Sequence, residues 1–220
     1  MSPSMRIPAA IIAVAGIAFV LALGFVVRLE VIAEEFDGEW MEEIVELRAP
    51  HWEFSSRMLD FVGGGWFALW VVPMCGVAVL LLLRRPWSAL AFALTLYVTA
   101  GVSPLLKWFF GRARPEEILV QVETAAFPSG HVAQAAAVAV ALALISARWQ
   151  VVVVAAVYVV LMALSRTYLG AHWVSDTLGG ALLGASVALG VWAIFASRLH
   201  SERKAAPPEL SDARALNDSQ

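Results

Sequence analysis

Hydrophobic residues fall in long uninterrupted blocks along this chain, separated by short charged segments. Uncharged runs cover residues 7–27, 61–83, 86–106, 132–147, 149–165 and 177–197. Because a helix needs about 20 apolar residues to cross a bilayer, four of these runs are long enough by themselves. Blocks of this kind indicate a chain solvated by lipid, and they predict an all-α fold: a bundle of six transmembrane helices.

The fourth and fifth runs are short, at 16 and 17 residues. They reach the length of a span only if the fourth helix begins near Ser129 and the fifth ends near Tyr168. Those extensions place His131 and Arg166 at helix ends, at the edge of the membrane. Ionisable residues at this depth usually serve a function.

The remaining segments complete the expected organisation. We interpret run 7–27 as a span rather than a signal peptide, because it has no clear small-residue cleavage site. Segment 28–60 mixes Trp40 and Met41 with many acidic residues, which fits either an amphipathic helix on the outer surface or a solvated connector. Residues 1–200 are expected to form one transmembrane domain, and the polar residues 201–220 a disordered cytoplasmic tail.

Composition agrees with a membrane protein. The chain is 60% hydrophobic and 15% charged, with a mean hydropathy of +0.77, whereas soluble domains carry about 25% charged residues. The net charge of −3 gives no indication of a nucleic-acid partner. Cys75 is the only cysteine, so an intrachain disulfide and a cysteine metal cluster are both excluded.

The basic residues next to the spans predict an orientation. With six crossings, one side receives Arg6, Arg84, Arg85, Arg148, Arg198, Arg203 and Lys204. Basic residues in short loops favour the cytoplasmic side. We therefore expect a plasma-membrane protein with both termini in the cytoplasm, and with loops 28–60, 107–130 and 166–176 on the extracytoplasmic side.

Three polar clusters lie at the outer ends of the third to sixth spans. They are Lys107 with Arg114–Pro115; Pro128–Ser129–Gly130–His131; and Ser165–Arg166 with His172 and Asp176. Three cations, two histidines, one carboxylate and a helix N-terminus suit a phosphate, since phosphoryl transfer depends on positioning and on charge stabilisation. Ser129 is expected to be an N-cap, and Gly130 to let the backbone approach an anion closely.

The spacing of His172 and Asp176 suggests a nucleophile and the carboxylate that orients it. Four residues apart, they share one face of a helix. A carboxylate bonded to one ring nitrogen leaves the lone pair of the other nitrogen free to attack phosphorus. His131, from another helix, would protonate the leaving oxygen and later activate water. The residues alone do not decide which histidine attacks.

In order and spacing, these clusters resemble the three signature motifs of the type 2 phosphatidic acid phosphatase superfamily, whose core would be the helices of spans three to six. The resemblance implies that His172 forms a phosphohistidine, that Asp176 supports it and that His131 is the general acid. It further implies phosphate binding by Lys107, Arg114, Arg166, Ser129 and Gly130. No metal or other cofactor is expected, and vanadate should inhibit.

The leading hypothesis is therefore an integral membrane phosphatase acting on a lipid phosphomonoester or diphosphate, such as phosphatidic acid, phosphatidylglycerol phosphate or undecaprenyl diphosphate. Its expected partners are this substrate and the membrane lipids. A non-catalytic lipid-phosphate binder or carrier is one alternative. A metal site of His131, His172 and Asp176 is another, although three nearby cations would repel the ion.

Other positions receive simpler interpretations. Arg112 is expected to contact a headgroup or to be solvated, Ser165 to pack, and Trp108 and Trp173 to anchor at the interface. His51 and His200 are taken as structural, and Gly63–Gly65 as having no functional role. Small residues at four-residue spacing predict close helix contacts: Ala133, Ala137 and Ala141, and separately Gly180 and Gly184.

Overall fold

Every element of the chain in residues 3–29, 33–122 and 125–205, the part that the computed structural model describes, is helical. In chain order these are α1 (Arg6–Arg28), α2 (Ala33–Glu46), α3 (Pro50–Gly63), α4 (Val72–Leu82), α5 (Pro86–Phe110), α6 (Gly130–Ser146), α7 (Trp149–Tyr168) and α8 (Val174–Ala205), with a 3-10 turn at Pro3–Met5 and a π-helical segment at Phe67–Val71. The prediction of an all-α fold is confirmed.

The helices that can cross a membrane are fewer than predicted. Four of them, α1, α5, α7 and α8, are long and apolar enough. A fifth crossing results if α3 and the helical stretch Phe67–Leu82, which meet at a bend of 47°, count as one broken span. α6 is apolar but only 17 residues long. The chain is thus a multi-pass membrane protein, and six crossings stay a prediction.

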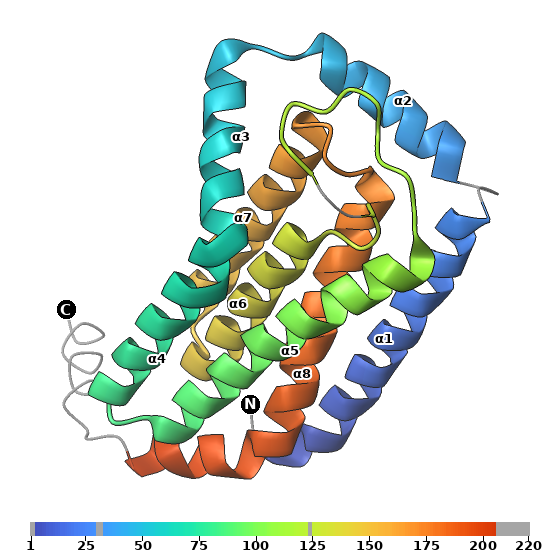
Figure 1. Cartoon of the computed structure of the whole chain (residues 1–220). Helices are drawn as coiled ribbons and strands as arrows, with labels where there is room; N and C mark the ends of the chain where they lie inside the picture. Colours follow the sequence, from blue (N-terminus) through green and yellow to red (C-terminus); the bar gives the residue numbers. More distant parts are fainter. Residues whose placement is uncertain (1–2, 30–32, 123–124, 206–220) are drawn as a thin grey trace, which may run out of the picture.

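The expected ends of the two short helices are confirmed. α6 begins at Gly130, directly after Ser129, and α7 ends at Tyr168. α6 lies in the middle of the bundle and packs mainly against α8, α7 and α5 (Figure 1). Because α6 is surrounded by other helices, its first turn lies inside the protein instead of facing lipid.

The second predicted span and the segment before it differ from expectation. Segment 28–60 contains most of two helices, α2 and α3, and α3 runs on into the apolar block that begins at residue 61. The chain then breaks at Gly64 and Gly65, where Gly65 has φ +54°, a left-handed conformation that favours glycine. α2 turns Asp37 and Met41 into the protein, where both are buried. Neither a solvated connector nor a single surface helix describes this segment.

Small residues bring α6 and α8 into close contact, as predicted. A methyl group added at Gly180 would collide with the backbone oxygen of Ser129, and one at Gly184 with that of Ala133. Packing at this distance is typical of helix pairs in membranes, where small residues let backbones approach. The contact fixes the start of α6 against the start of α8.

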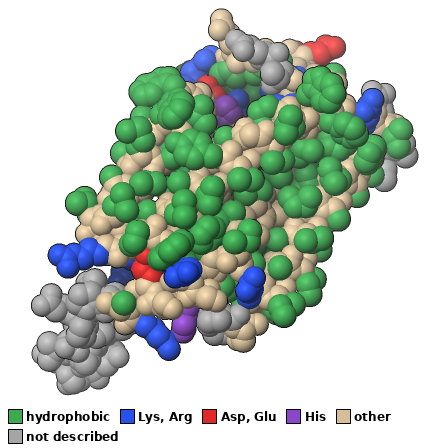
Figure 2. Space-filling view, turned by 60° about the horizontal axis from the view of Figure 1, so that its bottom comes forward, with side chains coloured by type: hydrophobic (Ala, Val, Ile, Leu, Met, Phe, Trp, Pro, Cys, Tyr) green, Lys and Arg blue, Asp and Glu red, His purple; other side chains and the backbone are tan. Residues whose placement is uncertain are grey.

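Apolar side chains cover the sides of the bundle. Leu82, Ile194 and Val14 are each more than 70% exposed, and Figure 2 shows hydrophobic side chains across the visible flank. Lys and Arg side chains gather at the end that carries the α4–α5 turn (Figure 2). An exterior of this kind is suited to lipid rather than to water.

The tail was predicted to begin at residue 201, but α8 continues through Ala205. Residues 206–220 lie outside the described residues. The physical reason is Glu202, whose carboxylate accepts hydrogen bonds from the backbone N–H groups of Trp87 (2.7 Å) and Ser88 (3.0 Å) and from the Ser88 hydroxyl (2.5 Å). These N–H groups belong to the first turn of α5 and have no partner within their own helix. Glu202 therefore caps α5 from the last turn of α8.

We expect Glu202→Ala to destabilise the protein. The substitution leaves two N–H groups of α5 without their acceptor, and hydrogen bonds to a charged group contribute about 1.5–3 kcal/mol each. The measurement is thermal unfolding in detergent, with Glu42→Ala, an exposed glutamate on α2, as the control. Equal unfolding midpoints for the two variants would contradict the capping role.

Candidate functional site

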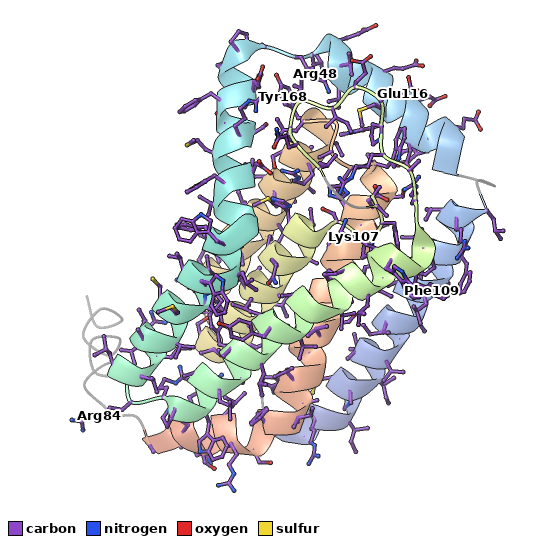
Figure 3. The ribbon with its side chains drawn as sticks, viewed as in Figure 1. Arg48, Arg84, Lys107, Phe109, Glu116 and Tyr168 are labelled. Carbon is purple, nitrogen blue, oxygen red and sulfur yellow. The ribbon has the colours of Figure 1, made fainter. Side chains whose placement is uncertain are left out.

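The three polar clusters of the sequence meet at one end of the bundle. Lys107 lies in the last turn of α5, and Gly111, directly after that helix, has a left-handed conformation. Ser129 is the N-cap residue of α6, and Arg166 lies in the last turn of α7. Figure 3 shows Lys107 in the half of the molecule that carries Arg48, Glu116 and Tyr168, whereas Arg84 lies at the opposite end.

His172 and Asp176 are adjacent, but not through a shared helix face. His172 lies in the turn before α8, which begins at Val174. Its Nδ1 is 3.6 Å from Oδ2 of Asp176. The same oxygen accepts a hydrogen bond from the backbone N–H of Trp173 at 2.9 Å, so the carboxylate reaches back over the start of its own helix, as in a capping box. Capping, not helical periodicity, holds the pair together.

The other ring nitrogen of His172 faces the cations. Nε2 is 3.4 Å from Nη1 of Arg114, and a guanidinium can only donate. This arrangement favours the tautomer with the proton on Nδ1, toward Asp176, and the lone pair on Nε2. The nitrogen that carries the lone pair thus points at the proposed phosphate site.

The surroundings keep His172 neutral. Its side chain is 3% exposed, and burial lowers the pKa of His172 well below its usual value. The positive charges of Lys107, Arg114 and Arg166 shift this pKa in the same direction. A neutral imidazole retains the lone pair that a nucleophile requires.

Two of the cations, Lys107 and Arg114, donate hydrogen bonds to the same backbone carbonyl group, that of Ala125. Nζ of Lys107 donates to the carbonyl oxygens of Ala125 (2.7 Å) and Ala126 (3.2 Å), and Arg114 donates to Ala125 (3.3 Å) and to Ala171. A Cβ at Gly130 would lie 3.9 Å from Cε of Lys107, so the first residue of α6 directly adjoins the lysine. Lys107, Arg114 and the start of α6 therefore border the same space.

Several buried polar atoms without partners lie here. Of the seven buried side-chain atoms in the described residues that make no hydrogen bond, three belong to this site: Ser129 Oγ, Arg166 Nε and His172 Nδ1. Although Ser129 occupies the N-cap position, its hydroxyl makes no capping bond. Unsatisfied buried donors are costly. An anion held between Ser129 and Arg166 would satisfy both residues.

Arg112 is neither solvated nor a headgroup contact, so that interpretation was wrong. Nη1 donates to Asp176 Oδ1 at 2.6 Å and to Ser175 Oγ at 2.7 Å, and Nη2 pairs with Asp37 at 2.8 Å. Asp37 also accepts from the backbone N–H of Ser175 at 3.0 Å. A chain of contacts thus runs from α2 through Arg112 to the carboxylate beside His172. The sequence alone does not indicate that Asp37, 75 positions earlier, is the partner of Arg112.

Asp60 is a second site residue that the sequence reasoning missed. Its carboxylate pairs with Arg166, and its Oδ1 is 3.1 Å from Nε2 of His131. Gly64 makes room for this contact, because a Cβ there would collide with the His131 ring. Gly64 therefore has a role in the site, contrary to expectation.

The remaining candidates behave more simply. The Ser165 hydroxyl bonds back to the carbonyl of Met162 at 2.8 Å, consistent with packing. Trp173 donates from Nε1 to Ala113 and lies under Arg112, so it joins the site loop and is more than an interfacial anchor. Within the described ranges no three His, Cys, Asp or Glu side chains are grouped as metal ligands. The geometry thus lends no support to the alternative metal site.

Residues 88–199 match the PAP2 superfamily. The chain is 31% identical over 150 residues to phosphatidylglycerophosphatase B of Bacillus subtilis, covering 64% of this chain and 73% of that protein. It is 32% identical over 155 residues to decaprenylphosphoryl-5-phosphoribose phosphatase of Mycobacterium tuberculosis, covering 68% and 84%.

Solved structures show the same fold. The crystal structure of a transmembrane PAP2 type phosphatidylglycerolphosphate phosphatase from Bacillus subtilis superimposes with a TM-score of 0.76 at 27% identity, covering 84% of this chain and 96% of that one. Aquifex aeolicus LpxE superimposes with a TM-score of 0.60 at 23% identity, covering 71% and 93%. The family match at residues 88–199 includes all three polar clusters.

The neutral state of His172 predicts a pH dependence of stability. Below about pH 6.5 the unfolded chain protonates this imidazole while the folded protein does not, so the free energy of unfolding falls as pH falls. The slope contributed by one such group is at most about 1.4 kcal/mol per pH unit. In thermal unfolding between pH 7.5 and 5, His172→Asn should lose less stability than the unsubstituted protein. The exposed His51→Asn should leave the slope unchanged, and equal slopes for all three proteins would contradict the argument.

Proposed function

The chain belongs to the PAP2 superfamily, and on that premise we propose that it is an integral membrane phosphatase that hydrolyses a phosphomonoester or diphosphate of a lipid through a phosphohistidine intermediate. The observation that carries this proposal is the buried, neutral His172, whose Nε2 faces Arg114 and whose Nδ1 faces Asp176. A nucleophile oriented by a carboxylate and aimed into a cationic site is an arrangement for phosphoryl transfer rather than for simple binding.

The first half of the reaction transfers the phosphoryl group to the enzyme. Nε2 of His172 attacks phosphorus as the bond from phosphorus to the lipid oxygen breaks. His131, as imidazolium, gives its proton to the departing oxygen. Asp176 stabilises the charge that develops on the His172 ring. For a diphosphate, the leaving group is the lipid monophosphate.

The second half regenerates the enzyme. His131, now neutral, accepts a proton from a water molecule that attacks the phosphohistidine, and the bond between phosphorus and nitrogen breaks. Inorganic phosphate leaves, and both rings return to their starting protonation states. Lys107, Arg114 and Arg166, with the Ser129 hydroxyl and the Gly130 N–H, hold the phosphoryl oxygens in both steps.

A lipid is the substrate class that the surroundings favour. The site lies at the end of a bundle whose sides are apolar, so a lipid can keep its hydrocarbon in the membrane while its phosphate enters the site (Figure 2). The two curated relatives are by name phosphatases of a phosphatidylglycerophosphate and of a prenyl-linked phosphoribose. These names support a lipid phosphomonoester as the first substrate to test.

Purified protein in detergent should release phosphate from lipid phosphomonoesters with EDTA present, and vanadate should inhibit, since it mimics five-coordinate phosphorus. Substituting His172 with Ala removes the nucleophile and should lower kcat by about 10³-fold or more. His51→Ala, a histidine exposed on α3, is the matched control and should retain full activity.

The same preparation distinguishes an enzyme from a lipid-phosphate binder. Rapid acid-free quenching should trap a phosphoenzyme that is stable in alkali and labile in acid, as a phosphoramidate is. Binding of lipid phosphate without turnover or phosphoenzyme would favour the non-catalytic carrier. Loss of turnover on chelation would count against the metal-independent scheme.

We further propose that the site faces the extracytoplasmic side of the plasma membrane, because Arg84, Arg85 and Arg203 lie at the opposite end of the bundle. In a Cys75→Ser background, an impermeant thiol reagent added to intact cells should label Glu116→Cys, at the site end, and spare Ser201→Cys, in the last turn of α8. Labelling of the second position alone would reverse the orientation.

A further inference from the structure

Asp60 lies outside the residues that match the family, yet it reaches the site. It belongs to the last turn of α3, and its carboxylate touches two residues that the mechanism uses. Oδ1 pairs with Nη1 of Arg166 and lies 3.1 Å from Nε2 of His131. One carboxylate oxygen thus connects a phosphate-binding cation with the proposed general acid.

The end of α3 reinforces this contact. The backbone oxygen of Asp60 is 3.2 Å from the same Nε2 of His131. This carbonyl belongs to the last turn of the helix, where carbonyls have no partner within the helix and carry the negative end of its dipole. A Cβ at Gly64 would collide with the His131 ring, and one at Gly63 would collide with Met162. The carboxylate and the backbone oxygen of Asp60 therefore both lie close to Nε2 of His131, and Gly64 leaves room for this contact.

We propose that Asp60 is a positioning residue that favours the protonated form of His131 and holds its ring in the orientation needed to deliver a proton to the leaving group. This role rests on the proposed function, since it assigns a task within that reaction. A carboxylate at 3.1 Å favours the imidazolium over the neutral ring. The backbone oxygen of Asp60 fixes the same ring edge, so charge and orientation come from one residue.

Asp60 need not compete with the substrate for Arg166. The carboxylate uses Nη1 of the guanidinium, whereas Nε is buried without a hydrogen-bond partner in the described part of the chain. A guanidinium presents five N–H donors in a rigid fork, so one edge can hold a carboxylate while another holds a phosphate oxygen. Asp60 then fixes one edge of the Arg166 guanidinium and leaves Nε available for a phosphate oxygen.

The charges around His131 identify Asp60 as the group that favours protonation. Burial of the ring disfavours its charged form most, and Arg166 on α7 opposes a second positive charge. The His172 ring interacts with His131 through space. Lys107 on α5 and Asp176 on α8 lie on the His172 side of the site. The carboxylate of Asp60 is therefore the group that opposes burial and Arg166 at the general acid.

The test compares two leaving groups. Asp60→Asn keeps the shape and a hydrogen-bond acceptor but removes the charge. For an alkyl lipid phosphate, whose leaving oxygen needs a proton, kcat should fall about 10- to 100-fold. For a phosphomonoester of nitrophenol, which leaves without a proton, kcat should change less than about threefold. The alkaline limb of the kcat profile for the alkyl substrate should move to lower pH by about one unit, because the ring loses its proton more readily.

Two further variants complete the experiment. Asp60→Glu retains the charge and should recover part of the alkyl activity, and Glu53→Gln, a carboxylate on the same helix that pairs with exposed Arg57, should behave as the unsubstituted protein. Equal losses on both substrates would overturn the proposal in favour of a role in phosphate binding. A lower KM with unchanged kcat would mean that Asp60 competes with substrate for Arg166, and a fall in thermal stability alone would mean a structural role. Absence of turnover in the unsubstituted protein would instead reject the proposed function, and with it this role.

Discussion

The close contact between α6 and α8 is the constraint on which the site depends. Gly180 and Gly184 allow the two backbones to approach so closely that a methyl group at either position would strike the facing helix. The contact places the N-terminus of α6 beside that of α8, and the N–H of Ser129 donates to the carbonyl of Asp176 at 3.0 Å. Two helix starts, each carrying part of the chemistry, are thereby fixed against each other. Their positive dipole ends converge where a phosphate is proposed to bind.

Both histidines are supported by the same kind of arrangement. His172 faces Asp176, which is held by Arg112, and His131 faces Asp60, which is held by Arg166. Asp176 is buried, and a buried carboxylate is tolerated when a cation and hydrogen bonds satisfy it. The two rings differ in what else they meet. Three cations act on His172, which suits a neutral nucleophile, whereas the negative end of α3 meets His131, which suits a proton donor.

The sequence predicted most of the site and only part of the fold. The apolar runs and the spacing of the polar clusters gave the helical class, the ends of α6 and α7, and a shared location for His131 and His172, because these are properties of local pattern. Two things were not predictable. The break at Gly64 and Gly65 lies inside a run that is apolar throughout, so hydropathy alone shows one span. Asp37 and Asp60 lie in an acidic segment where nothing in the local sequence distinguishes the two carboxylates that reach the site from those that do not.

The positions of these two carboxylates give segment 33–63 a role in the site. In a membrane enzyme with its motifs on α5 to α8, the preceding segment would ordinarily be assigned to substrate selection. Here α2 supplies Asp37 to the Arg112 network, and α3 supplies Asp60 to Arg166 and His131. The segment therefore helps to set the charge of the site from outside the region of family similarity. Since a side chain that shifts by 1 Å can cost a large factor in rate, replacing this segment with that of a relative would alter catalysis along with substrate choice.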